Sequence, residues 1–314
     1  MQLSDRIGRR LKLHDLHVLM TVVQAGSMNK AATLLNTGQS AISRSISDLE
    51  HAIGVRLLDR TPHGVEPTEY GRALLVGGAA MFDDLRQAVK SIDFLADPTV
   101  GEVRIGTILP LATSFVHAVI DRLSRRYPRI VCHCAIGQQN ALHRELMERD
   151  LDLLIAWKRT PDSDERSNFE LLYDDSYVVV AGTQSPWARR RRIELAELVG
   201  ETWTLPPTAT VLGAAVMEAF RARGLDCPRA TVLVLPEAVR VKLLTTGRFL
   251  SIFTSSGLRF SDERSKVKVL PVELPLDRLP VGIATLKNRT LSPVAQLFAD
   301  TARDVAKALR KRKL

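Results

Sequence analysis

Apolar residues at helical spacing recur through the first hundred residues of the chain. A first helix is predicted over residues 15–24 and a second over residues 28–35, with a break between them at Gly26 and Ser27. A glycine there is typical of a helix end, and a serine is typical of the cap that begins the next helix. The inward-facing positions of these helices are Leu16, Leu19, Met20, Val23, Ala31, Ala32 and Leu35.

A third helix is predicted over residues 39–51, after a turn at 36–38. Its apolar positions form one stripe, which comprises Ile42, Ile46, Leu49 and Ile53. A merely solvated helix usually carries lysine and glutamate on its other side, whereas this one carries Gln39, Ser40, Ser43, Arg44 and Ser47. Two helices joined by a short turn, the second with such a face, suit the DNA major groove, which is roughly 12 Å wide.

The polar face of the third helix matches hydrogen-bonding groups of DNA. Arg44 suits a bidentate contact to guanine and Gln39 suits one to adenine, while Ser40 and Ser43 suit phosphates or bases. Periodicity alone leaves an alternative, which is an ordinary three-helix packing unit with a serine-rich solvent face.

A short strand or helix end is predicted over residues 55–60, followed by a turn-rich stretch over 61–68. This pattern is consistent with a β-ribbon wing beside the helices, with Arg60 and His63 near DNA phosphates and Thr68 as the cap of the next helix. A plain loop is the alternative.

Residues 68–95 form one long predicted helix with the a/d spacing of a coiled coil. The seven positions of this repeat are Leu74, Gly78, Met81, Leu85, Ala88, Ile92 and Leu95. Self-association through this helix would pair two DNA-reading helices, which suits a two-fold related DNA site. A helix buried inside one domain gives a similar pattern and remains the alternative.

The pattern changes near Asp97, where strand-like runs begin to alternate with helical ones, as in an α/β region. The predicted strands cover residues 102–107, 130–136 and 152–156, and the predicted helices cover 112–126 and 139–149. The chain returns through strands near 267–286 to a final helix from about residue 292.

Composition and charge narrow the class of protein. The 314 residues are 45% hydrophobic and 25% charged, as in a globular protein of about two domains, and no apolar run is long enough to span a membrane. A polar N-terminus without a secretory signal, together with only three cysteines, predicts a cytoplasmic protein. Residues 1–96 carry 11 basic against 10 acidic residues, so the net charge of +9 resides mostly in the remainder, including Arg189–Arg192 and the basic tail.

No catalytic motif is present, so we expect neither an enzyme nor a bound cofactor. The sequence contains no Gly-x-Ser-x-Gly elbow, no phosphate-binding glycine loop and no His-Glu-x-x-His. Cys132, His133 and Cys134 are the one candidate metal cluster, but on a strand the two thiols point to one face and the imidazole to the other. We therefore predict core cysteines and no metal.

Residues 12–72 resemble the winged helix-turn-helix of LysR-type transcriptional regulators. The matching positions are Gly26, Ser27, Ala31, Ala32, Leu35, Gln39, Ala41, Ser43, Arg44, Ile46, Leu49, Glu50, Gly54, Val55, Leu57, Arg60, Thr68 and Gly71. Ser40, Leu58 and Pro67 depart from the residues usual in the family, which bears on packing details. The resemblance implies base or phosphate contacts by Gln39, Ser40, Ser43 and Arg44, with wing contacts near Arg60 and His63.

The resemblance continues through Gly101–Gly106 and Leu151–Ile155. It implies an α-helical winged helix-turn-helix (1–72) with a long linker helix (68–97), followed by an α/β two-lobed domain like a periplasmic binding protein (98–314). The first lobe would comprise about 98–160 and 267–314, and the second about 161–266. Ligands bind at the carboxyl ends of strands in such lobes, which predicts effector contacts by Thr107, Leu109, Gln138, Trp157, Trp203, Thr208 and Thr210.

These patterns together predict a transcriptional regulator. Its expected partners are double-stranded DNA, a small-molecule effector of unspecified identity and a second or further copies of the chain, as a homodimer or homotetramer. RNA polymerase is a further candidate partner, and no membrane is involved. The alternative is a metabolic enzyme or small-molecule-binding module whose N-terminal helices serve protein–protein contacts.

Overall fold

The computed structural model describes residues 11–61, 64–158, 165–259 and 262–311. Contacts divide the chain into two compact units, Met1–Val89 and Lys90–Leu314.

The first unit is a three-helix bundle with a two-stranded ribbon. The helices are α1 (Leu13–Ala25), α2 (Met28–Leu34) and α3 (Gln39–Ile53), and the antiparallel strands are β1 (Leu58–Thr61) and β2 (Gly64–Pro67). Gly26 ends α1 in the left-handed conformation at φ 68°, and the Ser27 hydroxyl accepts a hydrogen bond from the Lys30 amide. The predicted break, cap and ribbon are therefore confirmed.

The ribbon is anchored to the bundle through the backbone. The Val65 amide donates to the Gly26 carbonyl at 3.1 Å. Gly71, at the start of α4 (Glu69–Ala96), lies so close to β1 that a Cβ there would stand 2.1 Å from the Leu57 carbonyl oxygen. Only glycine fits at this position, because the neighbouring atom belongs to backbone that cannot rotate away.

The second unit contains two five-stranded sheets. The first sheet has the order β4-β3-β5-β12-β6 and the second has the order β11-β7-β10-β8-β9. The strands of the first are β3 (Val100–Thr107), β4 (Arg129–Ile136), β5 (Leu153–Trp157), β6 (Ser167–Asp175) and β12 (Leu279–Leu286). Those of the second are β7 (Tyr177–Gly182), β8 (Trp203–Leu205), β9 (Ala230–Leu233), β10 (Leu250–Thr254) and β11 (Val267–Val269).

Each sheet has a parallel part that is completed by antiparallel strands. In the first lobe β3 runs parallel to β4 and β5, and β12 runs antiparallel to both β5 and β6. In the second lobe β8 runs parallel to β9 and β10, and β7 runs antiparallel to β10 and β11. Because β6 pairs in the first sheet and β11 in the second, the second lobe spans about 177–269. The predicted start of the second lobe near 161 was therefore wrong, because β6 belongs to the first sheet, whereas the predicted end near 266 lies three residues before the end of β11.

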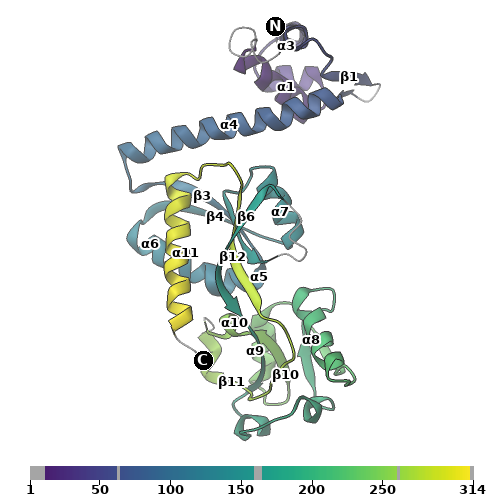
Figure 1. Ribbon diagram of the computed structural model, residues 1–314, viewed down its shortest axis with the longest axis vertical. Coiled ribbons are helices and arrows are strands. Elements are labelled where there is room, and N and C mark those ends of the chain that lie inside the picture. Colours follow the sequence, from purple (N-terminus) through teal and green to yellow (C-terminus); the bar gives the residue numbers. More distant parts are fainter. Residues whose placement is uncertain (1–10, 62–63, 159–164, 260–261, 312–314) are drawn as a thin grey trace. The chain divides into compact units, whose positions relative to one another are not determined.

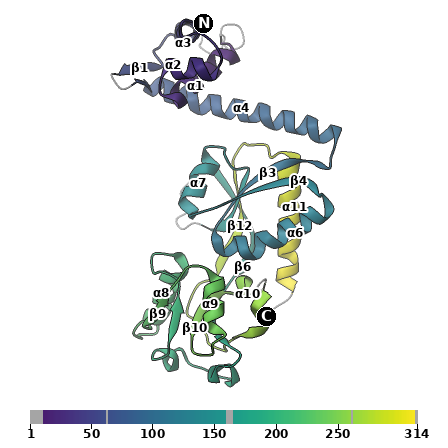
Figure 2. The same ribbon diagram turned by 180° about the vertical axis from the view of Figure 1, so that it is seen from behind.

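Helices cover both faces of the first sheet. A continuous helical stretch comprises α5 (Leu109–Leu111), the short π-helix η2 (Ala112–Val116) and α6 (His117–Arg126), and the other helices are α7 (Gln139–Met147) and α11 (Pro293–Lys311). Figures 1 and 2 show α6 and α11 together on one side of the sheet and α7 on the other. The predicted strands and helices of this lobe are observed within a few residues of their expected bounds.

The second lobe has helices on both of its faces as well. They are α8 (Val211–Ala222), α9 (Glu237–Leu244) and α10 (Ser255–Arg259), together with the short 3-10 turns η3 (Pro186–Arg189), η4 (Leu195–Leu198) and η5 (Asp262–Lys266). α8 packs on an apolar cluster that includes Trp203 and Ile252, and α9 packs on one that includes Val180 and Phe253.

Candidate functional site

α3 separates its apolar and polar side chains onto opposite sides. Ile42, Ile46 and Leu49 are at most 3% exposed and pack against α1 and α2. On the other side Gln39, Ser40, Arg44 and Ser47 are exposed and Ser43 is half-buried. The structure therefore brings the five predicted α3 residues together on one accessible face of the unit.

A buried polar contact that the sequence analysis missed holds α3 on α1. Ser45, which lies within the buried stripe of α3, donates from its hydroxyl to the carboxylate of Asp15. A serine in a serine-rich helix is easily assigned to the solvent face. The signal that could have identified Ser45 as buried is its position three residues after Ile42 and next to Ile46. The contact adds a buried polar link between α1 and α3 beside the apolar packing of Ile42 and Ile46.

Glu50, also on α3, joins this helix to the start of the ribbon. Its Oε1 atom accepts hydrogen bonds from the amides of Leu57 at 2.7 Å and Leu58 at 3.2 Å. The same carboxylate therefore satisfies two amides that belong to buried residues. Of the predicted wing contacts, Arg60 lies in β1 opposite Val65, and His63 lies outside the described residues.

α4 presents an apolar stripe with exposed side chains. Met81 is 43%, Leu85 50%, Ile92 65% and Leu95 81% exposed, and Ala88 is exposed as well. Leu74 packs instead against the core of the first unit, and the Gly78 backbone lies against Leu16. The first part of α4 is therefore used within its own unit, and a contact of the half-buried Leu74 with a second chain stays a prediction.

The predicted effector residues of the first lobe differ in what their side chains contact. Thr107 is fully buried, and its hydroxyl donates to the Ile155 carbonyl at 2.9 Å, so it is a structural residue. Gln138 is exposed at the start of α7, and Leu109 is half-buried at the start of α5. Trp157 is 6% exposed, and its Nε1 has no hydrogen-bond partner among the described residues.

In the second lobe, Trp203 is a core residue. It is fully buried, its Nε1 donates to the Leu198 carbonyl at 2.9 Å, and its ring meets Phe220 edge-on. The prediction of a ligand contact was wrong for this residue, because its side chain has no free surface. Thr210 caps α8 by accepting from the Gly213 amide, whereas Thr208 is exposed.

Asp175, which lies where the chain passes from one lobe to the other, is a second polar centre that the sequence analysis missed. It is 1% exposed and accepts hydrogen bonds from the Ser176 amide and from both the amide and the hydroxyl of Ser256. The Ser255 hydroxyl also donates to it, at 2.7 Å. The last residue of β6 thus holds the start of α10, and α10 in turn packs against η2 of the first lobe.

A buried ion pair lies on α9 in the second lobe. Arg240 is 1% exposed, its Nη1 donates to the Ile252 carbonyl at 2.8 Å, and its guanidinium lies 4.4 Å from the centre of the Phe253 ring. Its Nη2 is 3.9 Å from Glu237 Oε1. Burial raises the pKa of Glu237 to about 7 against the opposing effect of Arg240, and burial lowers the pKa of Arg240 to about 10.

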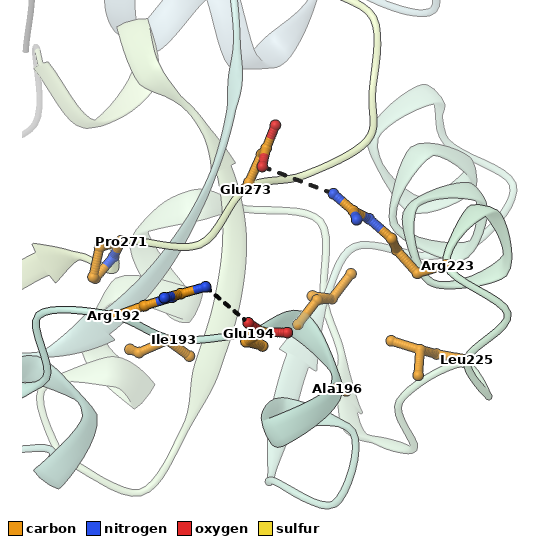
Figure 3. A pocket seen from close by; sticks show the side chains of 9 residues that line it. Arg192, Ile193, Glu194, Ala196, Arg223, Leu225, Pro271 and Glu273 are labelled. Atoms are coloured by element: carbon orange, nitrogen blue, oxygen red, sulfur yellow. Dashed lines mark hydrogen bonds and ion pairs between the residues drawn. The ribbon is translucent and has the colours of Figure 1, made fainter.

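A cavity of about 430 Å³ lies on the second lobe, between η4, the end of α8 and the segment around Pro271 (Figure 3). Ion pairs of 3.4 Å between Arg192 and Glu194 and of 3.9 Å between Arg223 and Glu273 flank it. None of the predicted effector residues lines it.

The cysteine prediction was wrong in part. Cys134 is exposed and Cys132 is half-buried, because β4 is the edge strand of its sheet. His133 lies on the other face, with Nε2 at 3.4 Å from Glu102 Oε2. Within the described residues there is no cluster of three or more His, Cys, Asp or Glu with metal-binding geometry. None of the described helices combines the length and apolar character needed to cross a membrane.

Comparisons with known proteins agree with this architecture. The family model of the bacterial regulatory helix-turn-helix protein of the lysR family matches residues 13–72, and that of the LysR substrate binding domain matches residues 96–307. The transcriptional regulator GbpR of Azospirillum brasilense is 27% identical over 290 residues, which cover 91% of this chain and 84% of GbpR.

Solved structures share the fold at low sequence identity. Full-length OxyR from Pseudomonas aeruginosa is 20% identical with a TM-score of 0.64 and covers 95% of this chain and 97% of that one. Full-length CbnR in complex with its target DNA is 18% identical with a TM-score of 0.54 and covers 94% of this chain and 100% of that one. Since the two family models together match most of its length, the chain belongs to the LysR family of helix-turn-helix transcriptional regulators.

Proposed function

We propose that this regulator reads DNA through the exposed face of α3, as a dimer formed through α4, and that a small molecule bound between the two lobes controls it. The observation that carries the proposal is the one-sided character of α3, with Arg44 and Gln39 exposed over a buried apolar stripe. Arginine and glutamine are side chains that pair bidentately with guanine and adenine in the major groove.

Dimerisation through α4 follows from its exposed stripe. Monomeric soluble proteins rarely leave a row of large apolar side chains in water, and Met81, Leu85, Ile92 and Leu95 form such a row at heptad spacing. A second α4 packed on this row would remove it from solvent and would give the dimer two reading helices. A homotetramer through the second unit is a further step of the same proposal.

The effector proposal uses those predicted residues whose side chains, unlike those of Thr107, Trp203 and Thr210, make no hydrogen bond within the protein that fixes them in the fold. Trp157 is the last residue of β5, and Leu109, Gln138 and Thr208 follow the ends of β3, β4 and β8, where orphan amides and helix N-termini collect. The effector binding domain of QuiR, 20% identical with a TM-score of 0.53 over 67% of this chain, has been solved in complex with shikimate. By analogy we propose that residues 96–307 bind a small organic effector.

An effector that binds one arrangement of the subunits better than another would shift the population and so change how DNA is engaged. RNA polymerase is the partner through which that change would alter transcription, and the cytoplasm is the compartment in which it would occur. We propose no catalytic role for the chain.

The DNA proposal is tested by fluorescence anisotropy with DNA from upstream of the protein's own gene. Replacing Arg44 by Ala should weaken the binding of cognate DNA by about 1–3 kcal/mol. It should also reduce the difference in affinity between cognate and scrambled DNA. Lys242→Ala, which removes an exposed charge from α9 in the other unit, is the matched control. An unchanged ratio of cognate to scrambled affinity in Arg44→Ala would contradict the reading role.

The alternative is a small-molecule-binding module or enzyme whose N-terminal helices make only protein contacts. Salt dependence separates it from the regulator, because neutralising several phosphates makes DNA affinity fall steeply between 50 and 200 mM salt. Weak binding that does not change with salt would favour the alternative.

A further inference from the structure

The cavity between η4, the end of α8 and the segment around Pro271 has no part in the proposed function. Its volume of about 430 Å³ lies within the range of about 300–1,000 Å³ that small-molecule pockets occupy. None of the residues proposed to contact the effector lines it. The second lobe therefore has room for a small molecule at a separate place (Figure 3).

The floor of this cavity is apolar and held in place. Ile193 and Leu195 are buried in the apolar cluster on which α8 packs, and Leu225 lies against the same cluster. The Glu194 amide donates to Glu197 Oε2 at 2.8 Å, and the Glu197 amide donates back to the Glu194 side chain. These reciprocal hydrogen bonds fix the turn that carries Ile193 and Leu195. A ligand with an apolar body would thus meet a surface that needs little rearrangement.

Two arginines reach the cavity from different elements. Arg192 precedes η4 and Arg223 follows α8, and both side chains are exposed (Figure 3). Arg192 Nη2 is 3.4 Å from Glu194 Oε1, and Arg223 Nη2 is 3.9 Å from Glu273 Oε2. Neither contact reaches the roughly 2.7–2.9 Å of a strong charge-assisted hydrogen bond, and a guanidinium has donors to spare for a second anion.

The two ion pairs can give way to a ligand at little cost. Exposed pairs contribute little to stability, because water screens them. Glu194 keeps the Glu197 amide as a partner when Arg192 turns to a ligand, and Glu273 is exposed to water. The segments around the cavity, 189–197, 221–226 and 271–273, carry six arginines against four carboxylates. This excess of positive charge favours an anion.

An anion that fits this cavity has two charged groups and an apolar body. Two guanidiniums from separate elements suit two carboxylates, because a guanidinium binds a carboxylate through two parallel hydrogen bonds. The apolar floor suits a hydrocarbon chain between them. Inorganic phosphate is a poorer match, since it leaves that floor in contact with water.

We propose that this cavity is a second small-molecule site, which binds an organic dianion of the dicarboxylate class through Arg192 and Arg223. The hydrocarbon part of the ligand lies on Ile193, Leu195 and Leu225. The site goes beyond the proposed function, since it is separate from the proposed effector residues and does not depend on DNA binding.

The test is isothermal titration calorimetry of the full-length protein, without DNA and at low salt, against succinate, glutarate, adipate and suberate. One chain length should bind best, because the two guanidiniums set the distance between the two carboxylates. The monocarboxylate of the same length and inorganic phosphate should each bind at least about 10-fold more weakly, because each lacks one of the two carboxylate contacts.

Variants show where the best dicarboxylate binds. Arg192→Ala and Arg223→Ala should each weaken its binding by at least about 10-fold. Arg191→Ala is the matched control, because it removes the same charge from the same exposed segment but does not line the cavity. Ala196→Phe should abolish binding by filling the cavity, with circular dichroism to verify the fold.

Three results would overturn the proposal. They are the absence of dicarboxylate binding to the wild type, an equal loss of affinity in Arg191→Ala and Arg192→Ala, and wild-type affinity in Ala196→Phe. Gln138→Ala removes a proposed effector contact and should leave the affinity for the dicarboxylate unchanged. A loss in Gln138→Ala as large as that in Arg192→Ala would also count against the cavity and would point to the proposed effector site instead.

Discussion

Replacing Glu50 by Ala should destabilise the DNA-binding unit and leave the second unit unchanged. The Glu50 carboxylate accepts from two amides, those of Leu57 and Leu58, which belong to residues at most 6% exposed. A hydrogen bond to a charged group contributes about 1.5–3 kcal/mol. Glu50 is itself half-buried, so water replaces part of what is lost, and we expect a loss of about 2–4 kcal/mol from the unfolding free energy.

The chain offers a convenient way to observe the two units separately. All three tryptophans, Trp157, Trp187 and Trp203, lie in the second unit, so their fluorescence follows its unfolding alone. Circular dichroism follows the helices of both units. With a urea dependence of about 1–3 kcal/mol per molar, a loss of about 2–4 kcal/mol moves the Glu50→Ala transition seen by dichroism to lower urea by about 0.7–4 M, while the fluorescence transition stays in place.

Two variants make this prediction sharp. Asp48→Ala removes an exposed carboxylate from the same helix and should change the unfolding free energy by less than about 0.5 kcal/mol. Glu50→Gln keeps an acceptor oxygen in reach of the amides and should lose less than half as much as Glu50→Ala. If Glu50→Ala and Asp48→Ala unfold at the same urea concentration, the two hydrogen bonds do not hold the ribbon to α3.

Three further results are expected. Leu85→Glu should convert the proposed dimer into a monomer in light scattering, whereas Val76→Glu should not, because Val76 is even more exposed (73% against 50%) but lies off the heptad stripe; a Leu85→Glu dimer would contradict the role of the stripe. The pKa of Glu237 is raised from 4.5 to about 7 in the folded state, so its contribution to stability is present below about pH 4.5 and is lost as the pH rises through about 7. Glu237→Gln should therefore flatten the decline of the second unit's unfolding free energy between pH 5 and 8, and an unchanged slope would refute this. Gly71→Ala should unfold the first unit at much lower urea, because its Cβ would stand 2.1 Å from the Leu57 carbonyl oxygen; a wild-type midpoint would show that the backbone yields.

The first unit was predictable from sequence because its signals are local. The stripe of Ile42, Ile46 and Leu49, the glycine at 26 and the serine at 27 each act within one or two turns of helix. The self-association stripe was less predictable at Leu74, since the same heptad spacing serves internal packing at one end of α4 and exposure at the other.

The arrangement of the second unit was harder to predict from the sequence, because its strands pair with strands that are distant along the chain. Periodicity identifies β6 as a strand but does not say which sheet it joins, and its partner β12 lies about a hundred residues further along. Likewise Trp203 was expected to contact a ligand, yet it is the first residue of the three-residue strand β8, away from its carboxyl end, and it is fully buried. Glu237 and Arg240 have the spacing of an ordinary surface pair, and only the packing of α9 buries them.

The second lobe is inserted in the sequence between two parts of the first lobe, and this sets an order of folding during translation. Residues 177–269 complete the second sheet, whereas the first sheet waits for β12, which enters between β5 and β6, and for α11, which ends at 311. At about 5–20 residues per second, the 42 residues from 269 to 311 take about 2–8 s to emerge. During that interval the second lobe has all of its strands and can fold, whereas the first lobe still lacks its central strand β12. Until β12 has been synthesised, β5 has no partner on that side.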